Sequence, residues 1–168
     1  MARMSRRQLL LGGAGIAAGG VAAGAFGLSL GSPATGFRVL SRAEVAVVRA
    51  AALTLFPGAP FPVDGLQAEV AEGVDAILSD VLAPLHAAGF RYVLRTLEWG
   101  TMASRGARFS RLPTADRQVV LDTWAEPKVF TRRVAGDSLR VVLGMAYFDH
   151  PAVLDHMEWN GGCSQGPS

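Results

Sequence analysis

The sequence predicts an all-α protein, a small irregular helical bundle of about five to six helices that follows an N-terminal signal segment. Apolar residues recur at helical spacing along most of the chain. Clusters of proline and glycine separate these stretches, and no stretch alternates apolar and polar residues as a strand would. We expect three parts: residues 1–37 as export signal and linker, 38–159 as the helical domain, and 160–168 as a flexible tail.

The first segment has the layout of an export signal. Its basic start and first apolar residues form a twin-arginine pattern, carried by Ser5, Arg6, Arg7, Leu9 and Leu10. No charged residue then appears until Arg38, and eight glycines and six alanines keep the run from Leu9 to Gly31 only mildly apolar. A twin-arginine signal is an address read by a translocase, here the one that moves folded proteins across the cytoplasmic membrane.

The same run is longer than the roughly 18 apolar residues that indicate a membrane span. A cleaved signal, an uncleaved signal and a membrane-anchored structural protein are therefore all open at this point.

The net charge of the chain outside the signal limits which classes of partner it can bind. The chain has 16 basic and 14 acidic side chains, and three of the basic ones precede residue 38, which leaves the remainder at −1. The high pI thus belongs mainly to the signal, and we expect no nucleic-acid partner.

The first helices can be placed from their apolar faces. Residues 35–40 read as a linker, and Ser41 with Glu44 forms a capping box that opens a helix. The apolar face of this helix comprises Val45, Val48, Ala52 and Leu55. Prolines in residues 57–62 end it. A second helix is expected to open at Asp64 or Gly65, with its inner face formed by Leu66, Val70, Val74, Ile77 and Val81.

Pro84 interrupts the second pattern, as a turn near 79–83 or as a kink. A third helix then carries Leu85, Phe90, Val93, Leu94 and Leu97 and ends near residues 99–104. A basic loop, 105–112, leads to a fourth helix with Thr114 as its expected cap. The inner face of that helix comprises Val120, Leu121 and Trp124.

The fifth helix is expected to be the longest and most apolar. Its stripe comprises Phe130, Val134, Val141, Met145 and Phe148, and it is widened by Leu139, Val142 and Leu143. A stripe of that width indicates contacts on more than one side of the helix. A short sixth helix should run from Pro151 to about Met157.

The sequence contains no pattern typical of a catalytic site. A local GxSxG motif is missing, and the single cysteine, Cys163, lies in a Gly/Ser tail. An exposed thiol, an intermolecular disulfide and a lipid attachment are the interpretations open for it. Asp149, His150 and His156 offer an alternative reading as an independent exported metal-binding protein or enzyme, although the two histidines lack the i, i+4 spacing of a helical metal pair. No CxxCH motif attaches a c-type haem.

Arginines and aromatic residues gather in the second half of the chain. They can be read as a solvated face or as a partner surface, because arginine and aromatics are enriched at interfaces. The candidate interface residues are Trp99, Arg108, Phe109, Arg111, Trp124, Tyr147, Phe148 and Trp159.

Three segments together carry a resemblance: LEWG at 97–100, RFSRLP at 108–113 and AYFDHPAV at 146–153. In this order and spacing they resemble the small subunit of gluconate 2-dehydrogenase, known as subunit 3, over about residues 41–159. The resemblance implies a non-catalytic accessory subunit, with no catalytic residues to carry over. It also implies a flavin-dependent dehydrogenase of the glucose–methanol–choline class as the large subunit.

The same resemblance implies how the assembly would work. FAD would belong to the partner and no cofactor to this chain, and a c-type cytochrome subunit would be a further partner that accepts electrons. A non-covalent flavin must be loaded before export, so the folded pair would leave the cytoplasm under this chain's signal. The expected location is the periplasm or the outer face of the cytoplasmic membrane.

Overall fold

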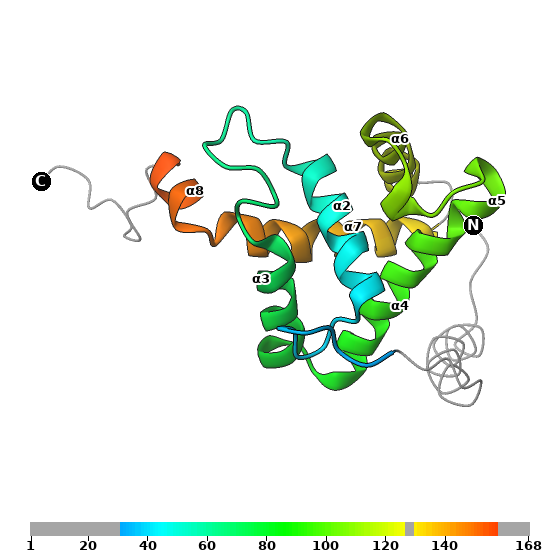
Figure 1. The fold of residues 1–168 in the computed structure, drawn as a ribbon, viewed down its shortest axis with the longest axis horizontal. Helices are drawn as coiled ribbons and strands as arrows, with labels where there is room; N and C mark the ends of the chain where they lie inside the picture. The colour runs from blue at the N-terminus through cyan, green and yellow to red at the C-terminus, as the bar shows by residue number, and fades with distance from the viewer. Residues whose placement is uncertain (1–30, 127–129, 158–168) are drawn as a thin grey trace, which may run out of the picture. The chain divides into compact units, whose positions relative to one another are not determined.

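The computed structural model describes residues 31–126 and 130–157. The export signal, Trp159, Cys163 and the tail lie outside these residues, so the predictions made for them stay predictions. The described fold belongs to the compact unit Ser32–Ser168 (Figure 1). Within the described ranges the chain forms helices and no strands, which confirms the all-α bundle.

Helix α2 (Arg42–Leu55) lies at the centre of the bundle, between α3 and α4 (Figure 1). Its capping box is present as predicted, because the Ser41 amide and hydroxyl both donate to the Glu44 carboxylate, at 2.8 and 2.7 Å. Val48, Ala51 and Ala52 are completely buried. Small residues on this face let neighbouring helices approach closely, which places α2 in contact with α3, α4 and α6.

Residues 35–40 are not the free linker that the sequence predicted. The buried Asp75 carboxylate accepts hydrogen bonds from the backbone amides of Arg38, Val39 and Leu40, at 2.7 to 2.9 Å. Leu40 is fully buried, and the Arg38 guanidinium forms a two-pronged contact with Asp80. These contacts attach residues 38–40 to the bundle, on α3 and the π-helical turn that follows it.

The second helix begins later than predicted. Turns occupy residues 65–69, and α3 runs over Val70–Ala76, continuing into a π-helical turn at Ile77–Val81. Asp64 still caps the preceding turn, since its Oδ1 accepts from the amides of Leu66 and Gln67. Leu66 and Val81, assigned to the inner face, are instead 43% and 67% exposed. The helix breaks at Leu82, as the proline signal predicted.

Helix α4 (Pro84–Gly100) starts with Pro84 in its first turn and is followed by α5 (Met102–Arg105). The predicted basic loop contains the end of α5 and a short 3₁₀ turn at Phe109–Arg111. Helix α6 (Thr114–Ala125) follows. Its N-cap is Pro113 and Thr114 is already helical, which corrects the predicted cap by one residue.

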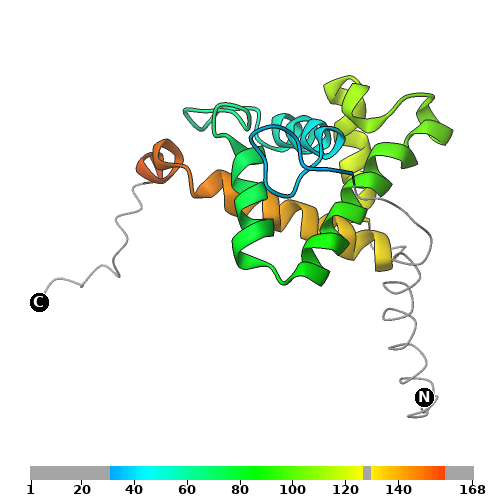
Figure 2. The same ribbon diagram turned by 60° about the horizontal axis from the view of Figure 1, so that its bottom comes forward.

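Helix α7 (Phe130–Phe148) is the longest helix of the described fold and runs along the bundle (Figures 1 and 2). It contacts α3, α4 and α6 along its length, and α8 (Pro151–His156) at its C-terminal end. Gly136 permits the closest approach: a Cβ at this position would lie 2.8 Å from the Trp124 carbonyl oxygen of α6. The α7 backbone is thereby fixed against α6.

Candidate partner-binding surface

Helix α7 is apolar on two opposite faces. Its inner face comprises Gly136, Leu139, Val142, Leu143, Ala146 and Tyr147, all buried. The residues that the sequence placed on its principal stripe are on the outside. Phe130, Val134, Val141, Met145 and Phe148 are between 38% and 67% exposed. The sequence predicted contacts on more than one side of this helix. Within the described structure only the inner face packs against the bundle, and the outer apolar face is exposed to solvent.

A second exposed row lies on α4. Leu85, Tyr92 and Trp99 follow one another at seven-residue intervals and are 71%, 55% and 54% exposed. Leu85, one of the apolar residues that predicted this helix, is thus on its exposed side. The sequence reasoning missed Tyr92 altogether, although its spacing from Trp99 was visible. Single apolar residues scattered over a protein surface are ordinary, but here they form aligned rows on the outer faces of two helices. Such rows are typical of a surface that binds a partner.

Trp99 and Arg108, two of the predicted interface residues, come together. The Arg108 guanidinium lies over the Trp99 ring, 4.1 Å from its centroid, in a cation–π contact. The loop is held in place by Glu98, whose carboxylate accepts from the Ser110 amide and hydroxyl at 2.9 and 2.8 Å. Arg111 is exposed beside it. These side chains are thus available on the surface, and their role in partner binding stays a prediction.

Two of the predicted interface residues are core residues instead. Phe109 and Tyr147 are both 0% exposed. Tyr147 stacks on Phe56, with ring centroids 4.2 Å apart, and donates its hydroxyl to the Val63 carbonyl at 2.8 Å. Burial, with a smaller contribution from Asp64, raises the pKa of Tyr147 above its ordinary value. Phe148 packs edge-on against the same group of rings while remaining 38% exposed.

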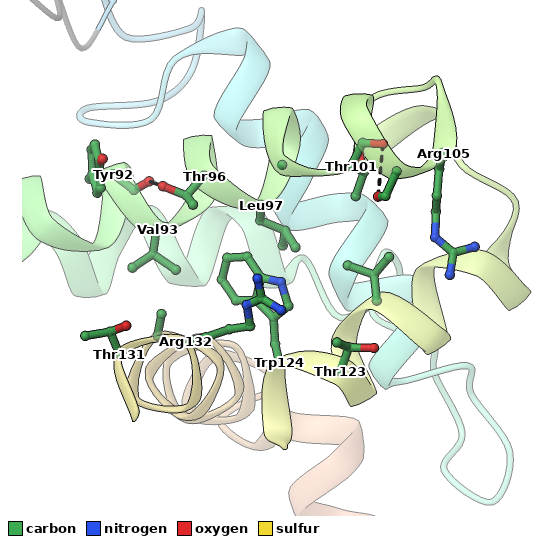
Figure 3. Close-up of a pocket in the computed structure, with 14 residues that line it drawn as sticks. Tyr92, Val93, Thr96, Leu97, Thr101, Arg105, Thr123, Trp124, Thr131 and Arg132 are labelled. Carbon is green, nitrogen blue, oxygen red and sulfur yellow. Dashed lines mark hydrogen bonds between the residues drawn. The ribbon is translucent and has the colours of Figure 1, made fainter. Parts of the chain in front are cut away.

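An open groove of about 890 Å³ lies between α4, α6 and α7 (Figure 3). Leu97 of α4 points toward Trp124 of α6, and Val93 of α4 points toward α7, which lines the groove with Thr131 and Arg132. Trp124, another predicted interface residue, is therefore half-buried at the base of a groove. The groove has the size of a ligand pocket, but its lining brings together no set of catalytic groups.

The structure does not support the metal-binding alternative. Among the described residues, no group of three or more His, Cys, Asp or Glu side chains lies close enough to hold a metal ion. His156 packs edge-on against Phe61, with ring centroids 5.4 Å apart, and His150 is the N-cap of α8. Asp149 is exposed at the end of α7. Packing accounts for His156, whereas the side chain of His150 makes no capping hydrogen bond and its buried Nδ1 has no hydrogen-bond partner in the described structure.

A buried ion cluster joins α2 to α4. Glu44 is 2% exposed and accepts from the guanidinium groups of Arg91, at 3.0 Å, and Arg95, at 3.2 Å. The sequence revealed the capping role of Glu44 but not these partners, which lie 47 and 51 residues away. The cluster orients α4, and with it the Tyr92 and Trp99 row.

None of the helices in the described ranges is both long and apolar enough to cross a membrane. A family model described as gluconate 2-dehydrogenase subunit 3 matches residues 42–160 of the chain. No curated protein and no solved structure matched in the corresponding comparisons. The matched range includes α2 through α8, and therefore the buried ion cluster, the groove and both exposed rows. The chain belongs to the gluconate 2-dehydrogenase subunit 3 family.

Proposed function

We propose that this chain is the non-catalytic accessory subunit of an exported, flavin-dependent dehydrogenase of the glucose–methanol–choline class. In this role it supports the folding, stability and twin-arginine export of the larger subunit. The family match over residues 42–160 is the observation that carries the proposal. The exposed apolar rows on α4 and α7 support it, because a subunit that works inside an assembly keeps such surfaces for its partner.

In this role the large subunit carries out the oxidation, and this chain accompanies it during export. FAD is bound by the large subunit, and a c-type cytochrome subunit receives the electrons. The Arg6–Arg7 signal of this chain directs the folded pair to the twin-arginine translocase, and the assembly works in the periplasm or at the outer face of the cytoplasmic membrane.

Purification of the affinity-tagged full chain from its native cell tests the proposal. We expect one flavin-containing polypeptide to copurify in a fixed ratio, and dehydrogenase activity on a sugar or alcohol to follow that polypeptide. The flavin absorbance per tagged chain gives the ratio directly. Recovery of the chain without flavin or dehydrogenase activity, under conditions that preserve weak complexes, would contradict the proposal.

A further inference from the structure

The outer face of α7 carries an apolar strip, with the exposed Asp137 at its edge between Val134 and Val141. At about 100° per residue, Phe130, Val134, Val141, Met145 and Phe148 all fall within an arc of about 60°. The buried residues of the helix centre on the opposite side, about 170° away. The strip, defined by these five residues, is therefore separate from the face that holds α7 in the bundle, except at Phe148, whose ring also packs edge-on against Phe56 and Phe61.

The spacing within the strip fits a helical partner. Val134, Val141 and Phe148 are seven residues apart, and Phe130 and Met145 lie beside this row. The strip extends over about 27 Å at 1.5 Å per residue. A seven-residue repeat along one helix forms the kind of seam into which a second amphipathic helix packs its apolar side chains.

Charges at the ends of α7 indicate the polarity of that partner. Arg132 and Arg133 lie in the first turns of α7, where no acidic residue is present, and Asp149 follows its last turn. Positive charge at a helix N-terminus and negative charge at its C-terminus both oppose the helix dipole. The Arg133 guanidinium stays at the edge of the strip, 5.9 Å from the Phe130 ring. Carboxylates on a partner would offset the unfavourable interaction between the arginine charge and the N-terminal end of the α7 dipole.

We propose that the α7 strip is the docking site for an amphipathic helix of the flavin-dependent dehydrogenase subunit, with acidic residues at the end that faces Arg133. This inference rests on the proposed function and locates its interface. A second copy of this chain fits the observations less well. Two-fold pairing along α7 would leave the α4 row of Leu85, Tyr92 and Trp99 in water, whereas a larger subunit can cover both.

A matched pair of valine substitutions tests the docking site. Val141 in the strip and Val119 on α6 are 58% and 51% exposed, and both lie within helices. We expect Val141→Asp to lower the flavin that copurifies with the tagged full chain at least tenfold, because it places a charge in an apolar seam. Val119→Asp should leave the ratio unchanged. Met145→Lys repeats the test, and circular dichroism checks that each variant keeps its helices.

A charge test addresses the orientation of the partner. Arg133→Glu should weaken copurification several-fold and remove much of its sensitivity to salt. The matched control is Arg42→Glu, which reverses one exposed arginine on α2 and should change little.

The outcomes separate the two proposals. If the unaltered chain brings down no flavoprotein, the proposed function fails, and the docking site fails with it. If the unaltered chain and folded Val141→Asp and Met145→Lys variants all retain the flavoprotein equally, the function stands and the α7 docking site is overturned. If the variants lose only a self-association of this chain while keeping the flavoprotein, the strip binds a second copy, which also overturns the inference.

Discussion

Glu44 shows how one side chain serves three elements. Its carboxylate completes the capping box of α2 and accepts from two arginines of α4, all at 2% exposure. A buried carboxylate is tolerated only where it is paired and hydrogen-bonded, and here both conditions are met. The side chains of Arg91 and Arg95 are 11% and 28% exposed, so neither is fully hydrated.

Glu44→Ala should destabilise the protein by about 3 to 5 kcal/mol, because it leaves two poorly hydrated guanidinium groups without this carboxylate. Urea unfolding of the full chain measures the loss. Glu72→Ala is the matched control, since Glu72 pairs with Arg49 at the surface and should contribute less than about 1 kcal/mol. Losses of the same size in both variants would show that the buried cluster does not orient α4 as described.

Tyr147 gives a pH dependence with a defined sign. Its folded-state pKa lies above the ordinary value of 10.0, through burial and the nearby Asp64. The stabilisation from the buried phenol is therefore fully present below pH 10 and is lost as the pH rises through the folded-state pKa, because the unfolded chain releases its proton first. The chain has two tyrosines and one lysine, so few other groups titrate in this range.

Tyr147→Phe should cost about 1 kcal/mol at neutral pH, through the lost hydrogen bond to Val63, and should remove most of the alkaline decline. The check is the urea midpoint measured from about pH 8 to about pH 11. Tyr92→Phe, at a position 55% exposed, should leave the decline in place. A decline that persists in Tyr147→Phe would assign it to another group.

At the scale of elements, the close approach of α6 and α7 depends on a glycine. Gly136 is buried, and an added Cβ would meet the carbonyl oxygen and carbon of Trp124 at 2.8 and 3.2 Å. These are backbone atoms of a packed helix, so they cannot move aside as a flexible side chain would. Gly89 in α4 is also helical, yet a Cβ there would meet no atom within 4 Å.

The two glycines should therefore respond to alanine with opposite signs. Gly89→Ala should stabilise the protein by about 0.5 to 1 kcal/mol, because alanine is the better helix former. Gly136→Ala should destabilise it by about 1 to 3 kcal/mol, since overpacking outweighs the same local gain. Thermal unfolding of the two variants checks the pair. Stabilisation by both would mean that α6 and α7 separate at little cost.

The helices themselves followed from local patterns, but their orientation did not. Capping residues, prolines and apolar spacing predicted α2, α4 and α8 closely. For α7 the sequence predicted contacts on two sides without identifying which face was internal, because a helix that is apolar on two faces satisfies the same periodicity either way. The start of α3 was wrong because residues 65–69 form turns despite their helical spacing, and Glu69, with a left-handed φ of 50°, immediately precedes the helix.

The candidate site was predictable only in part, for a related reason. Trp99 and Arg111 are exposed and Arg108 is half-buried against the Trp99 ring, while their role in partner binding stays a prediction. Phe109 and Tyr147 are buried, and composition cannot separate a core aromatic from an interface aromatic without the packing around it. The exposed strip on α7 can be identified only when the structure shows which of the two apolar faces of this helix is buried. The organisation of the whole assembly therefore has to be tested by experiments on the partner subunit and on the export signal.

At the scale of the whole molecule, export should depend on the guanidinium groups of Arg6 and Arg7 as well as on their charge. Arg6→Lys combined with Arg7→Lys keeps the charge of the segment but removes the planar groups that a receptor can recognise. We expect both this chain and the flavoprotein to remain in the cytoplasm.

Cell fractionation with flavin measured in each fraction follows both polypeptides at once. Arg3→Lys lies outside the paired motif and should leave export intact, which controls for the general effect of changing basic residues. Because the flavoprotein would travel as a folded passenger, its flavin should disappear from the periplasm in step with this chain. Continued export of the flavoprotein alone would mean that it has its own export signal, and that this chain binds the flavoprotein without being needed for its transport.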